Sequence, residues 1–405
     1  MSNMQIIIQL IISFLLAIAV SLYATRIVVH VVNKLNLFDR PNERSSAEKP
    51  VPTLGGIAIF FSFIFASSLG MSGYGFPEMI YILTALLLIF FVGLKDDIVT
   101  LSPYKKLTAQ IAAASILILL GDIRFTNLHG LFGIGGIGMI PSFLITTFTM
   151  VVIINAFNLM DGIDGLASGL SMMAALIFGG WFFISGHFGY AILSFSLVGA
   201  LAGFFYYNVY GKQYKIFMGD TGSLVLGTIM SILVIRFNEL NIDQAQPYAI
   251  ESVPAISFAI LAYPLFDTIR VMAIRMVHHQ SPFRADKNHL HHRLLALGFS
   301  HRAATYTIIG TNVAFICLIY AMHNLGILRI SFYMFMLGSL LFVIPAYFLK
   351  KNKLINADDP VQQLLIPEFT DEKKKRRRYV SRTKKEVPDL QSLRHQSFFQ
   401  KFNLW

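Results

Sequence analysis

A repeated pattern of amide and acidic side chains stands near the middle of the chain, in the run 155–166 (NAFNLMDGIDGL). Asn158, Asp161 and Asp164 are spaced three residues apart, so on a helical turn they would share a face. The run follows an apolar stretch, and acidic groups at a membrane boundary are costly to desolvate and usually serve a task. A single Asp there would be interpreted as a helix N-cap. The repeat, with its two glycines, favours a functional site.

A second acidic stretch ends the apolar run at 77–94. Asp96 and Asp97 are adjacent, and neighbouring carboxylates repel, which raises the pKa of one of them unless a cation lies between them. A divalent ion or a nearby lysine would relieve this repulsion; the lysines at hand are Lys95, Lys105 and Lys106. A solvated turn at the membrane surface is the alternative.

A third stretch, 217–223 (FMGDTGS), opens another apolar run. Its Gly-x-x-Gly turn would expose backbone N–H groups at a helix start, which suits a phosphate. Asp220 is either an N-cap or a metal ligand. Beside two other acidic stretches, the metal ligand is the favoured interpretation.

Three histidines lie in the basic loop at 276–303. His289 and His292 could share one helical face, and three histidines can bind zinc. The remaining candidate ligands are hard oxygens, and the only cysteine, Cys317, lies inside an apolar run. Hydrogen bonds or positive charge directed at a phosphate therefore fit these histidines better than zinc.

The acidic stretches together favour a hard cation. Carboxylates without His or Cys among them are typical of Mg²⁺ or Mn²⁺ sites. A hard cation with basic side chains is suited to a diphosphate. The expected substrates are a soluble nucleotide compound and a lipid from the bilayer.

Composition places the chain among polytopic membrane proteins. Hydrophobic residues make up 55% of its 405 residues, and the mean hydropathy is +0.62, which excludes an ordinary soluble domain. Apolar runs of about 17–25 residues, the length that crosses a bilayer core, predict an all-α fold with about eleven transmembrane helices. Their expected ranges are 5–32, 54–72, 77–94, 105–121, 141–159, 166–185, 189–208, 221–237, 252–275, 304–322 and 329–349.

Charge predicts the orientation. With the N-terminus outside, 29 of the 33 lysines and arginines fall on the cytoplasmic side, as the positive-inside rule requires. All four polar stretches then face the cytoplasm, together with the C-terminus. The loop at 122–140 falls outside and is rich in glycine (FGIGGIG).

Two domains are expected: a catalytic membrane domain at 1–349 and a basic cytoplasmic tail at 350–405, partly disordered. The tail contains the run 373–378 (KKKRRR). Contact with anionic lipid headgroups, at about 1 kcal/mol per basic residue, is one interpretation, and a solvated tail is the other. A nucleic-acid role does not fit a tail tethered to a polytopic protein.

At these stretches the sequence resembles the polyprenyl-phosphate N-acetylhexosamine-1-phosphate transferases. The resemblance covers roughly 35–303, and the His-x-His-His loop is similar to the branch that transfers GlcNAc-1-phosphate. The motifs that carry it are 39–42 (DRPN), 52–56 (PTLGG), 95–97 (KDD), 155–166, 207–208 (YN), 217–224, 264–267 (PLFD) and 281–293. Some family members have a third Asp near Thr100, which this chain lacks.

The resemblance implies a reaction and a site. UDP-GlcNAc and undecaprenyl phosphate would give undecaprenyl-diphospho-GlcNAc and UMP at the cytoplasmic face of a bacterial inner membrane, initiating O-antigen, teichoic acid or related glycans. Mg²⁺ would be bound by Asp220 with Asp97, and Mn²⁺ is the alternative ion. Asp96 and Asp97 would position the lipid phosphate, with Asp220 and His292 completing the catalytic set. The implied substrate-binding residues are Lys106, Asn158, Asp161, Asp164, Asn208, Phe217, Arg284, Lys287, His289 and His291. A homodimer is one possible assembly.

Three alternatives remain open from the sequence. A relative could use another UDP-N-acetyl sugar, such as a 6-deoxy-HexNAc or MurNAc-pentapeptide donor. An ion-coupled transporter would place charges near mid-span and repeat its two halves, neither of which this sequence shows. A prenyltransferase would need paired Asp-x-x-x-Asp motifs and would leave the histidine loop unexplained.

Overall fold

The computed structural model describes residues 3–35, 38–39, 51–277, 279 and 289–351 of the chain. Arg284, Lys287 and the basic tail beyond residue 351 lie outside the described residues, so the predictions for them stay predictions. Helices dominate the described part, and its short strands form two separate antiparallel pairs. The all-α architecture expected from composition is confirmed.

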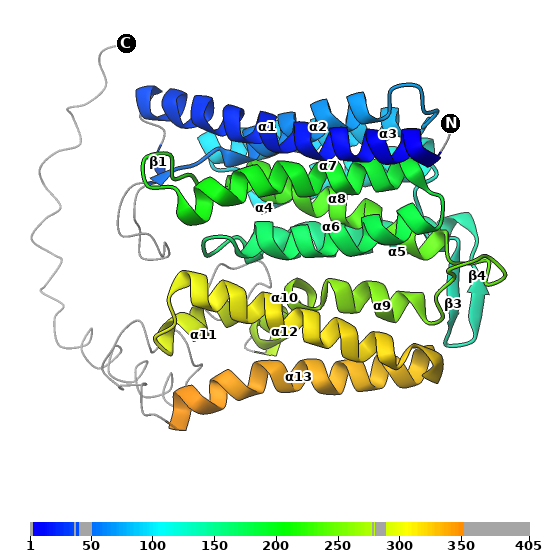
Figure 1. The fold of residues 1–405 in the computed structure, drawn as a ribbon. Coiled ribbons are helices and arrows are strands. Elements are labelled where there is room, and N and C mark those ends of the chain that lie inside the picture. The colour runs from blue at the N-terminus through cyan, green and yellow to red at the C-terminus, as the bar shows by residue number, and fades with distance from the viewer. Residues whose placement is uncertain (1–2, 36–37, 40–50, 278, 280–288, 352–405) are drawn as a thin grey trace, which may run out of the picture. The chain divides into compact units, whose positions relative to one another are not determined.

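Thirteen α-helices run through the described residues (Figure 1). They are α1 (Asn3–Leu35), α2 (Gly55–Gly70), α3 (Met79–Ile98), α4 (Pro103–Ser115), α5 (Met139–Met160), α6 (Leu166–Ile184), α7 (Phe188–Phe205), α8 (Gly219–Glu239), α9 (Val253–Ile260), α10 (Ala262–Val277), α11 (Leu290–Ala296), α12 (His301–Ala321) and α13 (Ile327–Lys351). π-Helical turns η1 (Ile116–Leu120) and η2 (Tyr206–Tyr210) extend α4 and α7, and a 3-10 turn, η3 (His323–Leu325), precedes α13. The strands are β1 (Phe38–Asp39), β2 (Val51–Pro52), β3 (Asn127–Leu131) and β4 (Ile134–Gly136).

Eight helices of the described part are long and apolar enough to cross a membrane, or nine if the bent pair α9–α10 is one crossing. Each of the eleven predicted ranges overlaps a helix or a pair of consecutive helices. However, α2 has 16 residues and α4 has 13, fewer than the roughly 20 of an upright crossing. The chain is therefore a multi-pass membrane protein, while the count of eleven and the N-outside orientation stay predictions.

The predicted span at 252–275 is not one straight helix, because the chain breaks between α9 and α10 with a bend of 83°, and the single crossing there stays a prediction. Pro264 has no N–H to donate to the carbonyl of Ile260 four residues earlier. The amide of Asn312, on α12, supplies the missing partners: Nδ2 donates to the Ile260 carbonyl (3.2 Å) and Oδ1 accepts from the Tyr263 N–H (3.1 Å). A break at membrane depth is tolerated because a neighbouring helix satisfies these backbone groups.

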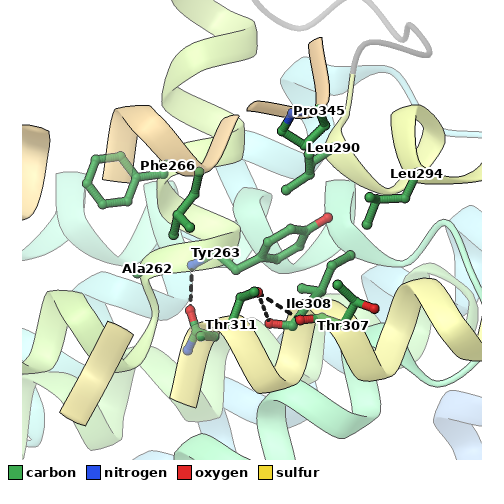
Figure 2. Close-up of a pocket in the computed structure, with 11 residues that line it drawn as sticks. Ala262, Tyr263, Phe266, Leu290, Leu294, Thr307, Ile308, Thr311 and Pro345 are labelled. Atoms are coloured by element: carbon green, nitrogen blue, oxygen red, sulfur yellow. Dashed lines mark hydrogen bonds between the residues drawn. The ribbon is translucent and has the colours of Figure 1, made fainter. Parts of the chain in front are cut away.

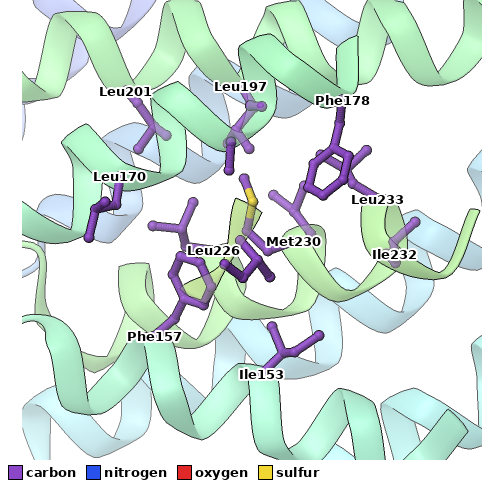
Figure 3. Packing of buried hydrophobic residues seen from close by; sticks show 14 of the residues in the cluster. Ile153, Phe157, Leu170, Phe178, Leu197, Leu201, Leu226, Met230, Ile232 and Leu233 are labelled. Carbon is purple, nitrogen blue, oxygen red and sulfur yellow. The ribbon is translucent and has the colours of Figure 1, made fainter. Parts of the chain in front are cut away.

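Helix α8 lies in the interior of the bundle. Of its most apolar stretch 89% is buried, compared with 18% for α13. Figure 3 shows Leu226 and Met230 of α8 packed between Phe157 of α5, Leu170 of α6 and Leu197 of α7. In a bilayer such contacts stabilise helix association through close packing rather than through exclusion of water.

The first turn of α8 is approached unusually closely by α2 and α3. A Cβ on Gly56 would lie 2.1 Å from the backbone N of Gly222, and a Cβ on Gly93 would lie 2.6 Å from the Cα of Thr221. The backbone N–H of Gly56 also donates to the carbonyl of Met218 (2.8 Å). Small residues permit this approach of backbones, which fixes the start of α8 against two other helices.

Replacing Gly56 by alanine tests this packing. We expect Gly56→Ala to destabilise the protein by about 1–3 kcal/mol, the usual cost of overpacking, because backbone must move to admit the methyl group. Gly180→Ala on α6 is the matched control, since nothing lies within 4 Å of a Cβ at that position. Thermal unfolding in detergent measures both. Equal melting temperatures for the two variants would contradict the close approach.

Candidate active site

The start of α8 is held by a carboxylate from α3. Oδ1 of Asp97 accepts a hydrogen bond from the N–H of Asp220 (2.7 Å), and Oδ2 accepts from the N–H (2.9 Å) and hydroxyl (2.5 Å) of Thr221. The first N–H groups of a helix lack partners within it and form the positive end of its dipole, so a carboxylate there is stabilising. Gly219 opens the helix at φ +74°, where a Cβ would lie 2.8 Å from Asp97 Oδ1. Asp97 thereby fixes the position of Asp220.

Lys106 of α4 lies between two carboxylates from different helices. Its ammonium pairs with Asp96 of α3 and lies 3.3 Å from Oδ2 of Asp220. Burial lowers the pKa of Lys106, but the charges of Asp220 and Asp96 outweigh it and raise the pKa above its usual value. Among the three lysines considered from the sequence, Lys106 is the one that relieves the repulsion between the acids.

Asn158 brings α5 into the same group. Its amide Nδ2 donates to Oδ1 of Asp220 and to the hydroxyl of Ser223 (2.9 Å). Asp220 is therefore contacted from α4 and α5, and its backbone from α3. The structure thus brings Asn158, Asp220, Asp97 and Lys106 together, while their roles in a site stay predictions.

Asp161 and Asp164 stand on the turn between α5 and α6, because α5 ends at Met160. The helical turn considered from their spacing is therefore wrong, and the two side chains have different surroundings. Burial raises the pKa of Asp161 to about 7, and the charges of Asp220 and Asp97 add to the effect.

Asp164 belongs to a separate ion pair. Its Oδ2 lies 2.5 Å from Nζ of Lys215 and 3.8 Å from Nδ1 of His301, and its carbonyl accepts from the hydroxyl of Thr305 (2.8 Å). These contacts link the turn after α5 to the segment before α8 and to α12. Asp164 is thus paired with the Lys215 ammonium, whereas Asp161 lies among acids.

Asn208 is buried, and its side-chain amide hydrogen-bonds to the backbone of two different loops. Its Oδ1 accepts from the N–H of Gly165 (2.6 Å) and its Nδ2 donates to the carbonyl of Ile216 (2.8 Å). Phe217 comes directly after Ile216. Its N–H donates to the carbonyl of Pro52, and its carbonyl accepts from the N–H of Gly55. Both residues brace the loops that carry the acids, a contribution that their residue types alone did not indicate.

The three histidines divide into two buried ones and one half-exposed one. His289 Nδ1 lies 2.7 Å from Oδ2 of Asp267. His291 is 1% exposed, and its Nδ1 lies 3.3 Å from the Tyr263 hydroxyl. Burial lowers the pKa of His291 well below its usual value, so this imidazole is neutral at physiological pH. His292 alone is half-exposed.

His291 also connects the histidines to the acidic turn. A Cβ on Gly162 would lie 2.4 Å from Nε2 of His291, so the ring rests directly on the backbone next to Asp161. Any side chain at Gly162 would push the two apart. The acidic stretches and the histidine loop, far apart in sequence, therefore meet at one end of the bundle.

Asp267 is a residue of this site to which the sequence assigned no role. Its carboxylate is 3% exposed and accepts from Arg270 (2.9 Å) and from the N–H of Leu290 (3.1 Å), in addition to the contact with His289. It holds the start of α11 to α10. The only sign of its importance in the sequence was its position at the end of the motif 264–267.

An apolar cavity lies beside the histidines, between α10, α11, α12 and α13 (Figure 2). Tyr263, Phe266, Leu290 and Leu294 contribute to its wall. The lining carries no charged side chain, so the cavity does not suit a nucleotide diphosphate.

The donor chemistry of the acidic group fits a hard divalent cation. Asp97 Oδ1 accepts one hydrogen bond and Oδ2 accepts two, which leaves one lone pair, on Oδ1. Asp220 and Asp96 share the Lys106 ammonium, so the two carboxylates are close enough to need a positive charge between them. No cluster of three or more His, Cys, Asp or Glu side chains arranged to hold a metal ion occurs in the described ranges. The oxygen set suits Mg²⁺ or Mn²⁺ better than zinc.

Comparison with known proteins gives a consistent result. The family model described as "Glycosyl transferase family 4" matches residues 79–238, which include the acids of α3, the turn after α5 and Asp220.

Two curated relatives match most of the chain. The undecaprenyl-phosphate alpha-N-acetylglucosaminyl 1-phosphate transferase of Escherichia coli O157:H7 is 32% identical over 278 residues, covering 68% of this chain and 73% of that protein. The probable undecaprenyl-phosphate N-acetylglucosaminyl 1-phosphate transferase of Bacillus subtilis (strain 168) is 32% identical over 302 residues, covering 74% and 81%.

The resemblance inferred from the motifs is therefore confirmed, and a transporter is not supported. The chain belongs to the family of membrane sugar-phosphate transferases, glycosyl transferase family 4, that includes the undecaprenyl-phosphate N-acetylglucosaminyl 1-phosphate transferases.

Proposed function

We propose that the protein transfers GlcNAc-1-phosphate from UDP-GlcNAc to undecaprenyl phosphate, giving undecaprenyl-diphospho-GlcNAc and UMP. The observation that carries the proposal is Asp220 at the start of α8, contacted by Lys106 and Asn158 and fixed by Asp97. The names of the relatives support undecaprenyl phosphate as the acceptor and GlcNAc-1-phosphate as the transferred group. A different UDP-N-acetyl sugar on the same site is the second candidate.

The chemistry is an exchange of one P–O bond for another. An oxygen of the lipid phosphate attacks the β-phosphorus of the donor, and the bond to the α-phosphate oxygen breaks to release UMP. A lipid phosphate is anionic near neutral pH, so the attack needs no strong base. The main barrier is the approach of two anions, which positive charge fixed in the site lowers.

Mg²⁺ would be held by Asp220 together with the remaining lone pair of Asp97, and Mn²⁺ could replace it. When bound, it would supply positive charge toward the diphosphate and the leaving UMP. The chain supplies further positive charge through Lys106, which Asp96 keeps in place.

His292 is the histidine of the loop best suited to touch the donor, because His289 and His291 are buried against Asp267 and Tyr263. In this proposal the two buried histidines set the shape of the loop. Arg284 and Lys287, outside the described residues, would add basic groups to the donor site. The whole site would face the cytoplasm of a bacterial inner membrane, on the side where basic residues concentrate.

Asp220→Asn tests the metal ligand. We expect a loss of at least about 10²-fold in kcat, because a group that stabilises charge in the transition state is removed. UMP release by purified protein measures it, with thermal unfolding showing that the variant is folded. Asp243→Asn, in the exposed loop after α8, is the matched control and should keep normal turnover. Near-normal activity of Asp220→Asn would contradict the assignment of Asp220 as a metal ligand.

His292→Ala tests the donor contact. Hydrogen bonds to charged groups contribute about 1.5–3 kcal/mol, so kcat/KM for the UDP-sugar should fall by about 10- to 100-fold. The KM for the lipid should change little. His323→Ala, at the other end of α12, serves as control. Unchanged donor kinetics would show that the histidine acts only on structure.

A further inference from the structure

The glycine-rich hairpin β3–β4 has no part in the proposed reaction. It precedes α5, which begins at Met139 and ends at Met160 beside the acids, so it lies at the opposite end of the bundle. Figure 1 shows it there, beyond the ends of the helices. β3 also contacts α9 and α13.

The tip of this hairpin exposes apolar side chains and no charge. No Asp, Glu, Lys or Arg occurs between residues 125 and 140. Burial lowers the pKa of the histidine in this segment, His129, so it is neutral as well. Phe132 is 78% exposed, Ile134 is 46% exposed and Ile140 is 75% exposed. Exposed apolar side chains gathered in one uncharged segment favour an interaction surface.

The backbone at the tip holds Phe132 in a conformation that favours glycine. Phe132 has φ +54°, a left-handed conformation that costs a non-glycine residue roughly 1–2 kcal/mol. Its neighbours Gly130 and Gly133 adopt positive φ at little cost. Phenylalanine therefore occupies a position that glycine would fill with less strain, and its ring points away from the protein core.

The exposed patch continues a lipid-facing stripe. Ile140, Leu144 and Phe148 recur every four residues on α5 and are 75%, 61% and 69% exposed. Because α5 is long and apolar enough to cross a membrane, this exposed apolar stripe is the face that it would present to lipid. The tip residues Phe132 and Ile134 lie just before the start of the stripe in the chain.

The base of the hairpin is fixed to the bundle, so the tip is presented in one place. The Glu239 carboxylate at the end of α8 accepts from the N–H and the hydroxyl of Thr126, each at 2.7 Å. The N–H of Ile137 closes the hairpin onto the Thr126 carbonyl (2.8 Å). Little conformational entropy is then lost when the tip enters a membrane.

We propose that the hairpin β3–β4 is a membrane anchor whose tip, with Phe132 and Ile134, inserts into the lipid leaflet at the end of the bundle opposite the acids. The depth is that of the headgroup and acyl boundary, about 5–10 Å, as for other interfacial apolar segments. The hydrocarbon core is excluded, because edge strands there would leave backbone groups without partners. Lipid is favoured over a protein partner, since the tip has none of the Arg, Tyr or Trp side chains that dominate protein interfaces.

The test places a fluorophore at the tip. In a Cys317→Ser background, Phe132→Cys is labelled with an environment-sensitive dye and reconstituted in phospholipid vesicles containing lipids spin-labelled near the top of the acyl chain. Leu144→Cys, on the lipid-facing stripe, is the positive control. Gln246→Cys, exposed on the polar loop at the same end, is the negative control.

We expect quenching at position 132 to approach that at position 144 and to exceed that at position 246 several-fold. Quenching at 132 equal to that at 246 would overturn the proposal, and so would a blue-shifted dye that the spin labels do not quench, which indicates a protein contact.

Phe132→Gly gives a second measurement. It should keep or raise thermal stability in detergent, by relieving the strain, and should gain less stability than the wild-type protein on transfer into bilayers. An equal gain in both proteins would also contradict the anchor.

Discussion

The cap that Asp97 places on the first turn of α8 is the interaction on which the rest of the site depends. A carboxylate from α3 satisfies N–H groups that a buried helix start would otherwise leave without partners. The approach is close because Gly56 and Gly93 let two helices touch the backbone of α8. Asp220 therefore stands at a fixed point where three helices and the turn after α5 meet, rather than on a solvated loop.

This arrangement concentrates negative charge, and the protein balances it locally. Lys106 lies between Asp96 and Asp220, while Lys215 pairs with Asp164 on the other side of the turn. Burial and the nearby charges of Asp220 and Asp97 raise the pKa of Asp161. A site of this kind has a strong requirement for positive charge, and a cation brought with a diphosphate substrate would meet it.

Much of the helical plan follows from hydropathy, since each predicted range coincides with a helix or helix pair. The break in the ninth range could not be predicted from hydropathy. It depends on Asn312, about fifty residues away, which bonds the backbone groups that have no helical partner beside Pro264. Motif residues such as Asp220 and Asn158 could be grouped from their chemistry alone. The different partners of Asp161 and Asp164, and the burial of His291 on Gly162, required the tertiary fold, because both contacts join segments distant in sequence.

The most direct test of the central claim is UMP release by the purified wild-type protein across a panel of UDP-N-acetyl sugars, with and without undecaprenyl phosphate. The account predicts release with UDP-GlcNAc only when the lipid is present, abolished by EDTA and restored by Mg²⁺. Folded protein that releases no UMP with any donor, or releases it equally without the lipid, would contradict the account.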